Sequence, residues 1–160
     1  AVADACKVPV IAAGGLHDGR SVVAAMVLGA EGVQLGSRFV ATPESSAHQA
    51  FKEAVLSAEE GSTSLELKEV TPVRLLDNPF AQRVVAAQQA GASQDELRAL
   101  LGIRRAKRGM FEGDMTEGEL EIGQVSSMLR DLEPAGDIVE RLVKECMALA
   151  GPDWANRWGL

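Results

Sequence analysis

Two short apolar segments that each end in glycine constrain the fold of this chain more than any other feature. Residues 8–15 read VPVIAAGG and residues 32–37 read GVQLGS. A strand that is apolar throughout is typically buried on both faces, as in a parallel sheet covered by helices. Between the two segments, Asp18 can cap a helix over residues 21–28, and Gly29 suits the position just after that helix. The pattern predicts a right-handed β-α-β unit.

The glycines at the two strand ends predict a phosphate site. Glycine has no Cβ, so the backbone N–H groups of Gly14, Gly15 and Gly36 can approach a ligand closely. A helix that follows each strand adds its positive end to these donors. Two such ends side by side form the phosphate cradle after strands seven and eight of a (β/α)₈ barrel. Simple strand-ending turns are the alternative, and the presence of both turns favours phosphate binding.

The length of the chain limits how much of a barrel it can supply. A complete (β/α)₈ barrel takes about 250 residues and rarely fewer than about 200, whereas this sequence has 160 residues and begins almost inside the first strand. We therefore expect an α/β chain that forms the C-terminal portion of a TIM barrel, strands seven and eight, with a mostly helical appendage. The expected division is 1–60 for the last two βα units and 61–160 for the appendage. A small self-sufficient domain is the alternative.

Local signals outline the rest of the chain. The sequence Thr42-Pro43-Glu44 resembles a helix entry and leads to a helix predicted over residues 47–59. Ser93 and Glu96 form a capping box. Short extended segments are expected at 63–68 and 72–76, helices over 78–90, 93–101, 124–132 and 137–149, and a surface loop over the Gly-, Asp- and Glu-rich stretch 110–123. Trp154 and Trp158, four residues apart, predict one face of a last helical turn.

Composition excludes several classes of function. The net charge of −7 argues against general nucleic-acid binding, and the absence of an uninterrupted apolar run of membrane-spanning length argues against a membrane partner. Cys6 and Cys146 lie far apart without a CxxC spacing, which indicates reduced thiols and a cytoplasmic protein. Two histidines at these spacings, His17 and His48, provide neither a metal site nor a Ser-His-Asp triad.

A few other residues have a functional and a plain interpretation. His48 is expected to cap or pack a helix rather than act as a base, and His17 lies close enough to the first glycine turn to contact a phosphate. The basic cluster of residues 104–108 (RRAKR) is either a solvated helix end or a docking patch for an anionic partner. The acidic residues that follow it are expected to neutralise it rather than to bind a metal. These residues are Glu112, Asp114, Glu117, Glu119 and Glu121.

Several motifs taken together resemble one flavoprotein family. Residues 9–15 (PVIAAGG), 18–20 (DGR) and 29–39 (GAEGVQLGSRF) are similar to the flavin-binding half of the FMN-dependent nitronate monooxygenases and flavin-type enoyl-acyl carrier protein reductases II. The resemblance continues at 44–52, 112–118 and 123–124. It implies an FMN phosphate held by the backbones of Gly14, Gly15, Gly36 and Ser37, with Gln34 beside the flavin. Ser37 stands where the family usually has Thr, which keeps a hydroxyl donor.

The resemblance also implies an activity. It predicts an FMN-dependent oxidoreductase, with the enoyl-acyl carrier protein reductase of fatty acid synthesis, using NAD(P)H, favoured over a nitronate monooxygenase. The catalytic residues are not identified. The expected partners are a small-molecule or acyl-thioester substrate, an acyl carrier protein and a second copy in a homodimer. A truncated, inactive phosphate-binding fragment is the alternative from another class. An IMP-dehydrogenase-like barrel is disfavoured because no nucleophilic Cys loop lies between the strands.

Overall fold

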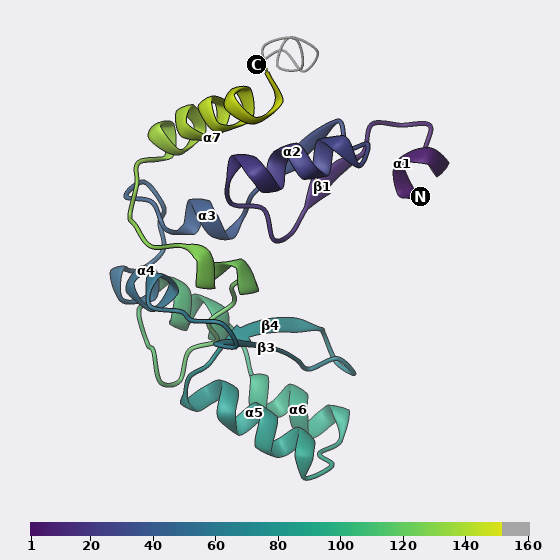
Figure 1. Cartoon of the computed structure of the whole chain (residues 1–160). Helices are drawn as coiled ribbons and strands as arrows, with labels where there is room; N and C mark the ends of the chain where they lie inside the picture. Colours follow the sequence, from purple (N-terminus) through teal and green to yellow (C-terminus); the bar gives the residue numbers. More distant parts are fainter. Residues whose placement is uncertain (152–160) are drawn as a thin grey trace. The chain divides into compact units, whose positions relative to one another are not determined.

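A computed structural model describes residues 1–151, which form two compact units. Unit 1 combines Ala1–Glu44 with the chain from Asp131 onward, and unit 2 is Ser45–Arg130. The predicted division at residue 60 refers to the barrel of a longer protein and stays a prediction. Unit 1 contains α1 (Val2–Ala5), β1 (Ile11–Ala13), α2 (Gly19–Val27), β2 (Gly32–Gln34), α3 (Ser37–Val40) and α7 (Ala135–Ala150) (Figure 1).

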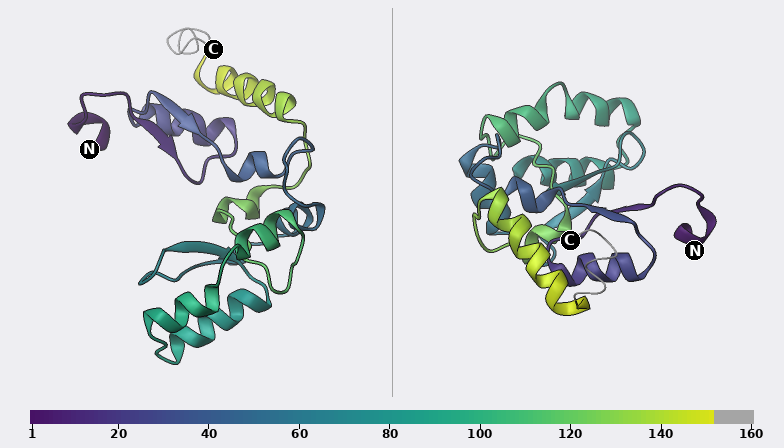
Figure 2. Two further views of the ribbon diagram at one scale, coloured as in Figure 1. Left: turned by 180° about the vertical axis from the view of Figure 1, so that it is seen from behind. Right: turned by 90° about the horizontal axis from the view of Figure 1, so that it is seen from above.

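The predicted β-α-β unit is present in unit 1. Strands β1 and β2 pair in parallel, with Ile11 opposite Gly32 and Ala13 opposite Gln34. Helix α2 begins where predicted, because the Asp18 carboxylate accepts a hydrogen bond from the Ser21 N–H at 2.8 Å. Helix α7 packs along α2, and both views in Figure 2 show the two helices side by side. The C-terminal helix thus covers the connection between the two strands.

The strands of this unit are not buried on both faces, contrary to the prediction. Ile11 is 55% exposed, and Ala13 and Gln34 are exposed too. The reason is that β1 and β2 form a two-stranded sheet within the described residues, so this part of the chain supplies no further strand to cover them. The apolar composition of the two strands therefore did not predict their exposure within the described residues.

The residues after β2 also differ from expectation. The predicted helix entry at Thr42 instead closes a short helix, α3, that starts directly after Gly36. The Thr42 hydroxyl donates a hydrogen bond to the Phe39 carbonyl at 3.0 Å. The second glycine turn therefore leads straight into helical backbone, as the phosphate interpretation requires.

Unit 2 is built on a β-hairpin packed against helices. It contains α4 (Gln49–Leu56), β3 (Thr63–Glu66), β4 (Val73–Leu76), α5 (Pro79–Gln89), α6 (Gln94–Leu101), the π-helical turn η1 (Lys107–Phe111) and the 3₁₀ turn η2 (Gln124–Met128). Strands β3 and β4 are antiparallel, and α5 and α6 lie beside each other next to the hairpin (Figure 1). The core consists of Leu67, Leu75, Phe80, Ala81, Val84 and Leu97. The Asn78 cap of α5 and the Ser93–Glu96 capping box of α6 confirm two predicted helix starts.

The prediction of a surface loop over residues 110–123 is wrong for the second half of that stretch. This half is buried at Leu120 and Ile122 and runs beside β4, where the Leu76 N–H donates to the Leu120 carbonyl at 2.8 Å. The glycines serve close packing: a Cβ on Gly109 would lie 2.7 Å from the Glu119 carbonyl oxygen, and one on Gly118 would lie 2.6 Å from the Gly109 nitrogen. The glycine content therefore reflects backbone contact rather than exposure.

The C-terminal helices match the prediction in part. The helix predicted over 124–132 is the short η2 turn, and the chain becomes extended at Leu129. The extended stretch is compatible with Pro134, because proline disfavours helical backbone at the residue before it. Helix α7 contains the predicted range 137–149. Trp154 and Trp158 lie outside the described residues.

Candidate phosphate-binding site

The two glycine turns leave the sheet of unit 1 at the same edge. Ala13 and Gln34 are paired in the parallel register, so Gly14–Gly15 and Leu35–Gly36 follow the two strands at adjacent positions. Gly14 has a φ of +91° and Gly15 a φ of +74°. L side chains rarely adopt this backbone region, which makes glycine the residue that fits there. The predicted residues of both turns therefore come together.

The space beside these glycines is open. A Cβ added at Gly14, Gly15 or Gly36 would meet no atom within 4 Å. Gly36 is the N-cap residue of α3 and provides no side chain to cap that helix, and Ser37 follows as its first residue. Gln34 is exposed at the end of β2. A phosphomonoester needs several N–H or O–H donors and little steric bulk, and this edge of the sheet places open space beside the backbone of both turns.

The start of α2 does not add its donors to this site, contrary to the expectation that both helices would. The Gly19 N–H donates to the Glu145 carboxylate at 2.6 Å, and the Ser21 N–H donates to Asp18. Burial raises the pKa of Asp18, but the hydrogen bonds from Ser21 outweigh it and hold the pKa below its usual value. Two carboxylates therefore already occupy the positive end of α2.

Arg38 lies next to the second glycine turn. It is part of the motif over residues 29–39, but the motif did not indicate its structural role. It lies in α3 two residues after Gly36, and its side chain is only 2% exposed. Its guanidinium donates to the Asp131 carboxylate at 2.6 Å and to the Glu133 carboxylate at 2.8 Å. A buried arginine held by two carboxylates fixes the helix that carries it. The partners lie more than 90 residues away along the chain, so no local signal pointed to them.

The two histidines have different surroundings. His48 caps α4, because its Nδ1 accepts the Ala50 N–H at 3.2 Å, and this confirms the capping role. The Nε2 of His17 is 3.9 Å from the Asp18 carboxylate. Its buried Nδ1 has no hydrogen-bond partner among the described residues. A contact between His17 and a phosphate stays a prediction.

The basic cluster of residues 104–108 is neutralised within unit 2, as the plain interpretation expected. Lys107 pairs with Glu112 at 2.8 Å, and Arg108 pairs with Asp114 at 2.6 Å. The hydrogen bond from Lys107 holds the pKa of Glu112 below its usual value. These pairs favour a solvated, internally paired segment over an anion-docking patch.

Glu119 belongs to the same acidic stretch but is 7% exposed. Burial, together with the nearby Glu121 carboxylate, raises its pKa to about 7 against the opposing effect of Arg105. The pKa in the folded state lies above the ordinary value, so the folded state retains a proton that the unfolded state releases. The stability gained from that proton is complete below about pH 4.5 and is lost as the pH rises through about 7.

We expect Glu119→Gln to remove this pH dependence. Between pH 5 and pH 8 the wild type must ionise a buried carboxyl group, and the variant need not. The free energy of unfolding of the wild type should therefore fall by about 2 kcal/mol relative to that of the variant over this interval. Urea unfolding at both pH values measures the difference. The exposed Glu60→Gln is the matched control and should follow the wild type. Parallel curves for Glu119→Gln and the wild type would contradict the prediction.

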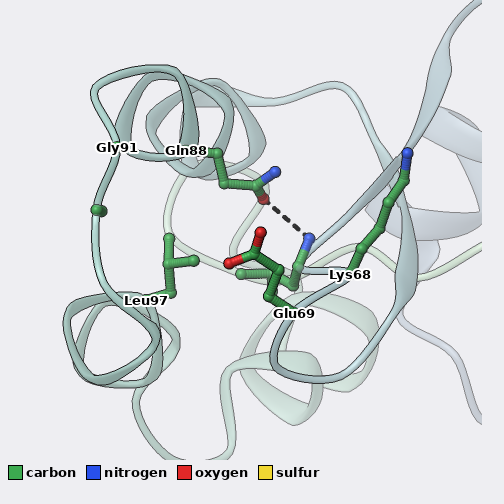
Figure 3. Close-up of a pocket in the computed structure, with 7 residues that line it drawn as sticks. Lys68, Glu69, Gln88, Gly91 and Leu97 are labelled. Atoms are coloured by element: carbon green, nitrogen blue, oxygen red, sulfur yellow. Dashed lines mark hydrogen bonds between the residues drawn. The ribbon is translucent and has the colours of Figure 1, made fainter.

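Unit 2 also has a pocket of about 400 Å³, away in sequence from the glycine turns. It is lined by Leu67, Lys68, Glu69, Gln88, Gly91, Ala92 and Leu97. The Gln88 side chain accepts the Leu67 N–H at 2.9 Å, and Lys68 points away from Gln88 (Figure 3).

Within residues 1–151, no group of three or more His, Cys, Asp or Glu side chains is placed to hold a metal ion. In the same residues, no helix is long and apolar enough to cross a membrane.

Comparison with known proteins gives a consistent set of relatives. The family model described as nitronate monooxygenase matches residues 1–145. A probable nitronate monooxygenase from Staphylococcus saprophyticus is 43% identical over 82 residues, which cover 51% of this chain and 23% of the relative. One from Staphylococcus aureus is 32% identical over 150 residues, covering 90% of this chain and 40% of the relative.

Solved structures show the same likeness. FabK from Thermotoga maritima superposes with a TM-score of 0.85 at 34% identity, covering 92% of this chain and 47% of FabK. A nitroalkane oxidase from Streptomyces ansochromogenes gives a TM-score of 0.73 at 32% identity, covering 92% of this chain and 42% of the oxidase. The chain therefore spans less than half the length of each of these relatives.

Proposed function

The chain belongs to the nitronate monooxygenase family, and from that premise we propose that the whole protein is an FMN-dependent oxidoreductase built on a TIM barrel. The observation that carries the proposal is the pair of glycine turns at one sheet edge, with open space beside Gly14, Gly15 and Gly36. In the proposal these turns and Ser37 bind the phosphate of FMN. The relatives span more than twice the matched length, so the remaining barrel strands belong to the longer protein in this proposal.

The residues of this chain would bind and orient the cofactor. The backbone N–H groups of the two turns would donate to the phosphate oxygens, and the Ser37 hydroxyl would provide a further donor. Gln34, exposed at the end of β2, would lie beside the flavin. FMN itself would supply the redox chemistry, since flavins accept and pass on hydride or electrons. The positions of Gly14, Gly15 and Gly36 thus determine where the cofactor is held.

Two finer activities fit this cofactor. We favour reduction of an enoyl thioester by NAD(P)H, as in fatty acid synthesis, with an acyl carrier protein as the partner. The higher TM-score with FabK than with the nitroalkane oxidase supports this choice. The second candidate is nitronate oxidation with O₂, which the names of the curated relatives support. A homodimer remains part of the proposal for either activity.

The test uses the full-length protein. A yellow preparation with flavin absorption that NADH or NADPH bleaches is the expected result. Reduction of a crotonyl thioester is then compared with nitronate-dependent O₂ uptake, and the first activity should be the larger. A protein that takes up no flavin would contradict the proposal, and O₂ uptake with nitronate alone would support the second candidate.

The alternative that this chain is an inactive phosphate-binding fragment is tested by assaying the 160-residue chain beside the full-length protein. We expect the isolated chain to turn over neither substrate, because the proposed site needs the rest of the barrel. Substrate turnover by the isolated chain would contradict that division of roles.

A further inference from the structure

Charged side chains in unit 1 form a continuous path between the helices that follow the two glycine turns. The path begins at Arg38 in α3, whose Nη2 donates to Oε2 of Glu133 at 2.8 Å. The same oxygen accepts a bond from Nη2 of Arg141 at 3.0 Å. Nη1 of Arg141 donates to Oε1 of Glu145 at 3.0 Å, and Oε2 of Glu145 accepts the Gly19 N–H at 2.6 Å.

This path runs through α7 and the residues just before it, and its two ends lie at the starts of α2 and α3. Gly19 is the first residue of α2 and comes four residues after Gly15. Arg38 is the second residue of α3 and comes two residues after Gly36. Each end of the path therefore lies within four residues of a proposed phosphate-binding glycine.

The contact between α7 and the start of α2 is close. A Cβ on Gly19 would clash with the Glu145 side chain and would lie 3.0 Å from its carbonyl carbon and 3.1 Å from the Cys146 nitrogen. Cys146 is 2% exposed, and its Sγ contacts the Gly19 carbonyl oxygen at 3.8 Å. The start of α2 is thus held by α7 through both packing and a charge-assisted hydrogen bond.

The charges along the path support one another. The hydrogen bond from Arg141 lowers the pKa of Glu133 against the opposing effect of burial, and Arg38 lowers it further. The hydrogen bond to Glu133 likewise raises the pKa of Arg141. The Glu133 side chain is 21% exposed, and those of Arg141 and Glu145 are each 35% exposed. Networks in such partly buried positions order side chains more firmly than isolated surface pairs.

We infer that Arg38, Glu133, Arg141 and Glu145 form a clasp, referred to here as the α7 clasp, that fixes the spacing of the two glycine turns for the phosphate of the cofactor. The inference rests on the proposed function. The four residues are positioning residues, since they act through the turns and not by touching the cofactor. In this proposal α7 contributes to the affinity for the cofactor, a role that the glycine motifs alone do not indicate.

The clasp is tested by comparing FMN with riboflavin, which lacks the phosphate. In the full-length protein, Glu145→Ala removes both the Arg141 pair and the acceptor for the Gly19 N–H. Glu145→Gln keeps a neutral acceptor for that N–H and loses the charge. The control is Glu140→Ala, which removes an exposed carboxylate from the same helix. Dissociation constants for both flavins come from fluorescence titration of the apoprotein, and melting temperatures are measured alongside.

We expect Glu145→Ala to weaken FMN binding about tenfold, which corresponds to about 1.4 kcal/mol, while riboflavin binding changes less than twofold. Glu145→Gln should fall between Glu145→Ala and the wild type, and Glu140→Ala should match the wild type. Equal weakening of both flavins, or unchanged FMN binding, would overturn the clasp. Tighter FMN binding in Glu145→Ala would also overturn it, because the carboxylate would then compete with the phosphate for the start of α2.

Failure of the proposed function has a different signature. A wild-type protein that binds riboflavin as tightly as FMN, or binds neither, would overturn the phosphate site itself and the clasp with it. A wild type that prefers FMN, with variants that keep the full preference, would overturn the clasp alone.

Discussion

Replacing Gly118 with alanine is expected to lower the free energy of unfolding by at least about 3 kcal/mol, the largest stability effect among our predictions. The new Cβ would clash with the Gly109 Cα and the Asp114 carbonyl oxygen and would lie 2.6 Å from the Gly109 nitrogen. These neighbours are backbone atoms, so they cannot turn aside as a flexible side chain would. The buried segment that runs beside β4 should loosen as a result. Urea unfolding of the variant and the wild type measures the effect.

Gly136→Ala is the control for that experiment. A Cβ at this position in α7 would meet no atom within 4 Å, and alanine favours helix over glycine by up to about 1 kcal/mol. The control should therefore be as stable as the wild type or slightly more stable. A Gly118→Ala protein with wild-type stability would show that the 105–120 region is not packed as described.

Gly14→Ala is expected to weaken FMN binding by about 10- to 100-fold in the full-length protein, the largest binding effect. Alanine is strained at a φ of +91°, so the turn should shift and misplace its N–H donors. Each hydrogen bond to a charged group contributes about 1.5–3 kcal/mol, and the loss of one accounts for the expected range. The new methyl group would also enter the open space that the phosphate would fill.

Gly61→Ala is the matched control for the turn. Gly61 has a φ of +85° and likewise has open space around its Cβ position, but it lies in unit 2. The two variants should lose similar stability, about 1–2 kcal/mol, whereas only Gly14→Ala should lose FMN. Equal FMN affinity in both variants would show that the first glycine turn does not bind the phosphate.

Local rules predicted those parts of the fold that depend on a few neighbouring residues. Asp18, Asn78 and Ser93 cap helices as expected, because a cap needs only one side-chain oxygen and the N–H groups two or three residues later. The positions of the two glycine turns could likewise be predicted from the sequence, since the strands that precede them are short, apolar and separated by one helix. The predicted β-α-β unit follows from these signals alone.

Contacts between distant parts of the sequence were beyond such rules. Gly109 and Gly118 suggested an exposed loop because composition does not distinguish a glycine in solvent from one in contact with backbone. The burial of Glu119 was hidden for the same reason. Arg38 and Glu133 are 95 residues apart, and Gly19 and Glu145 are 126 residues apart. The i, i+4 spacing of Arg141 and Glu145 on α7 is the one signal that could have indicated part of the clasp.

The ratio of the riboflavin and FMN dissociation constants of the full-length wild-type protein tests the phosphate site most directly. The two flavins share the same ring system and differ at the phosphate, so the ratio isolates the contribution of the glycine turns. Several backbone donors to a dianion should make FMN bind at least about 100-fold more tightly than riboflavin. Equal dissociation constants for the two flavins would contradict a phosphate site at Gly14, Gly15, Gly36 and Ser37.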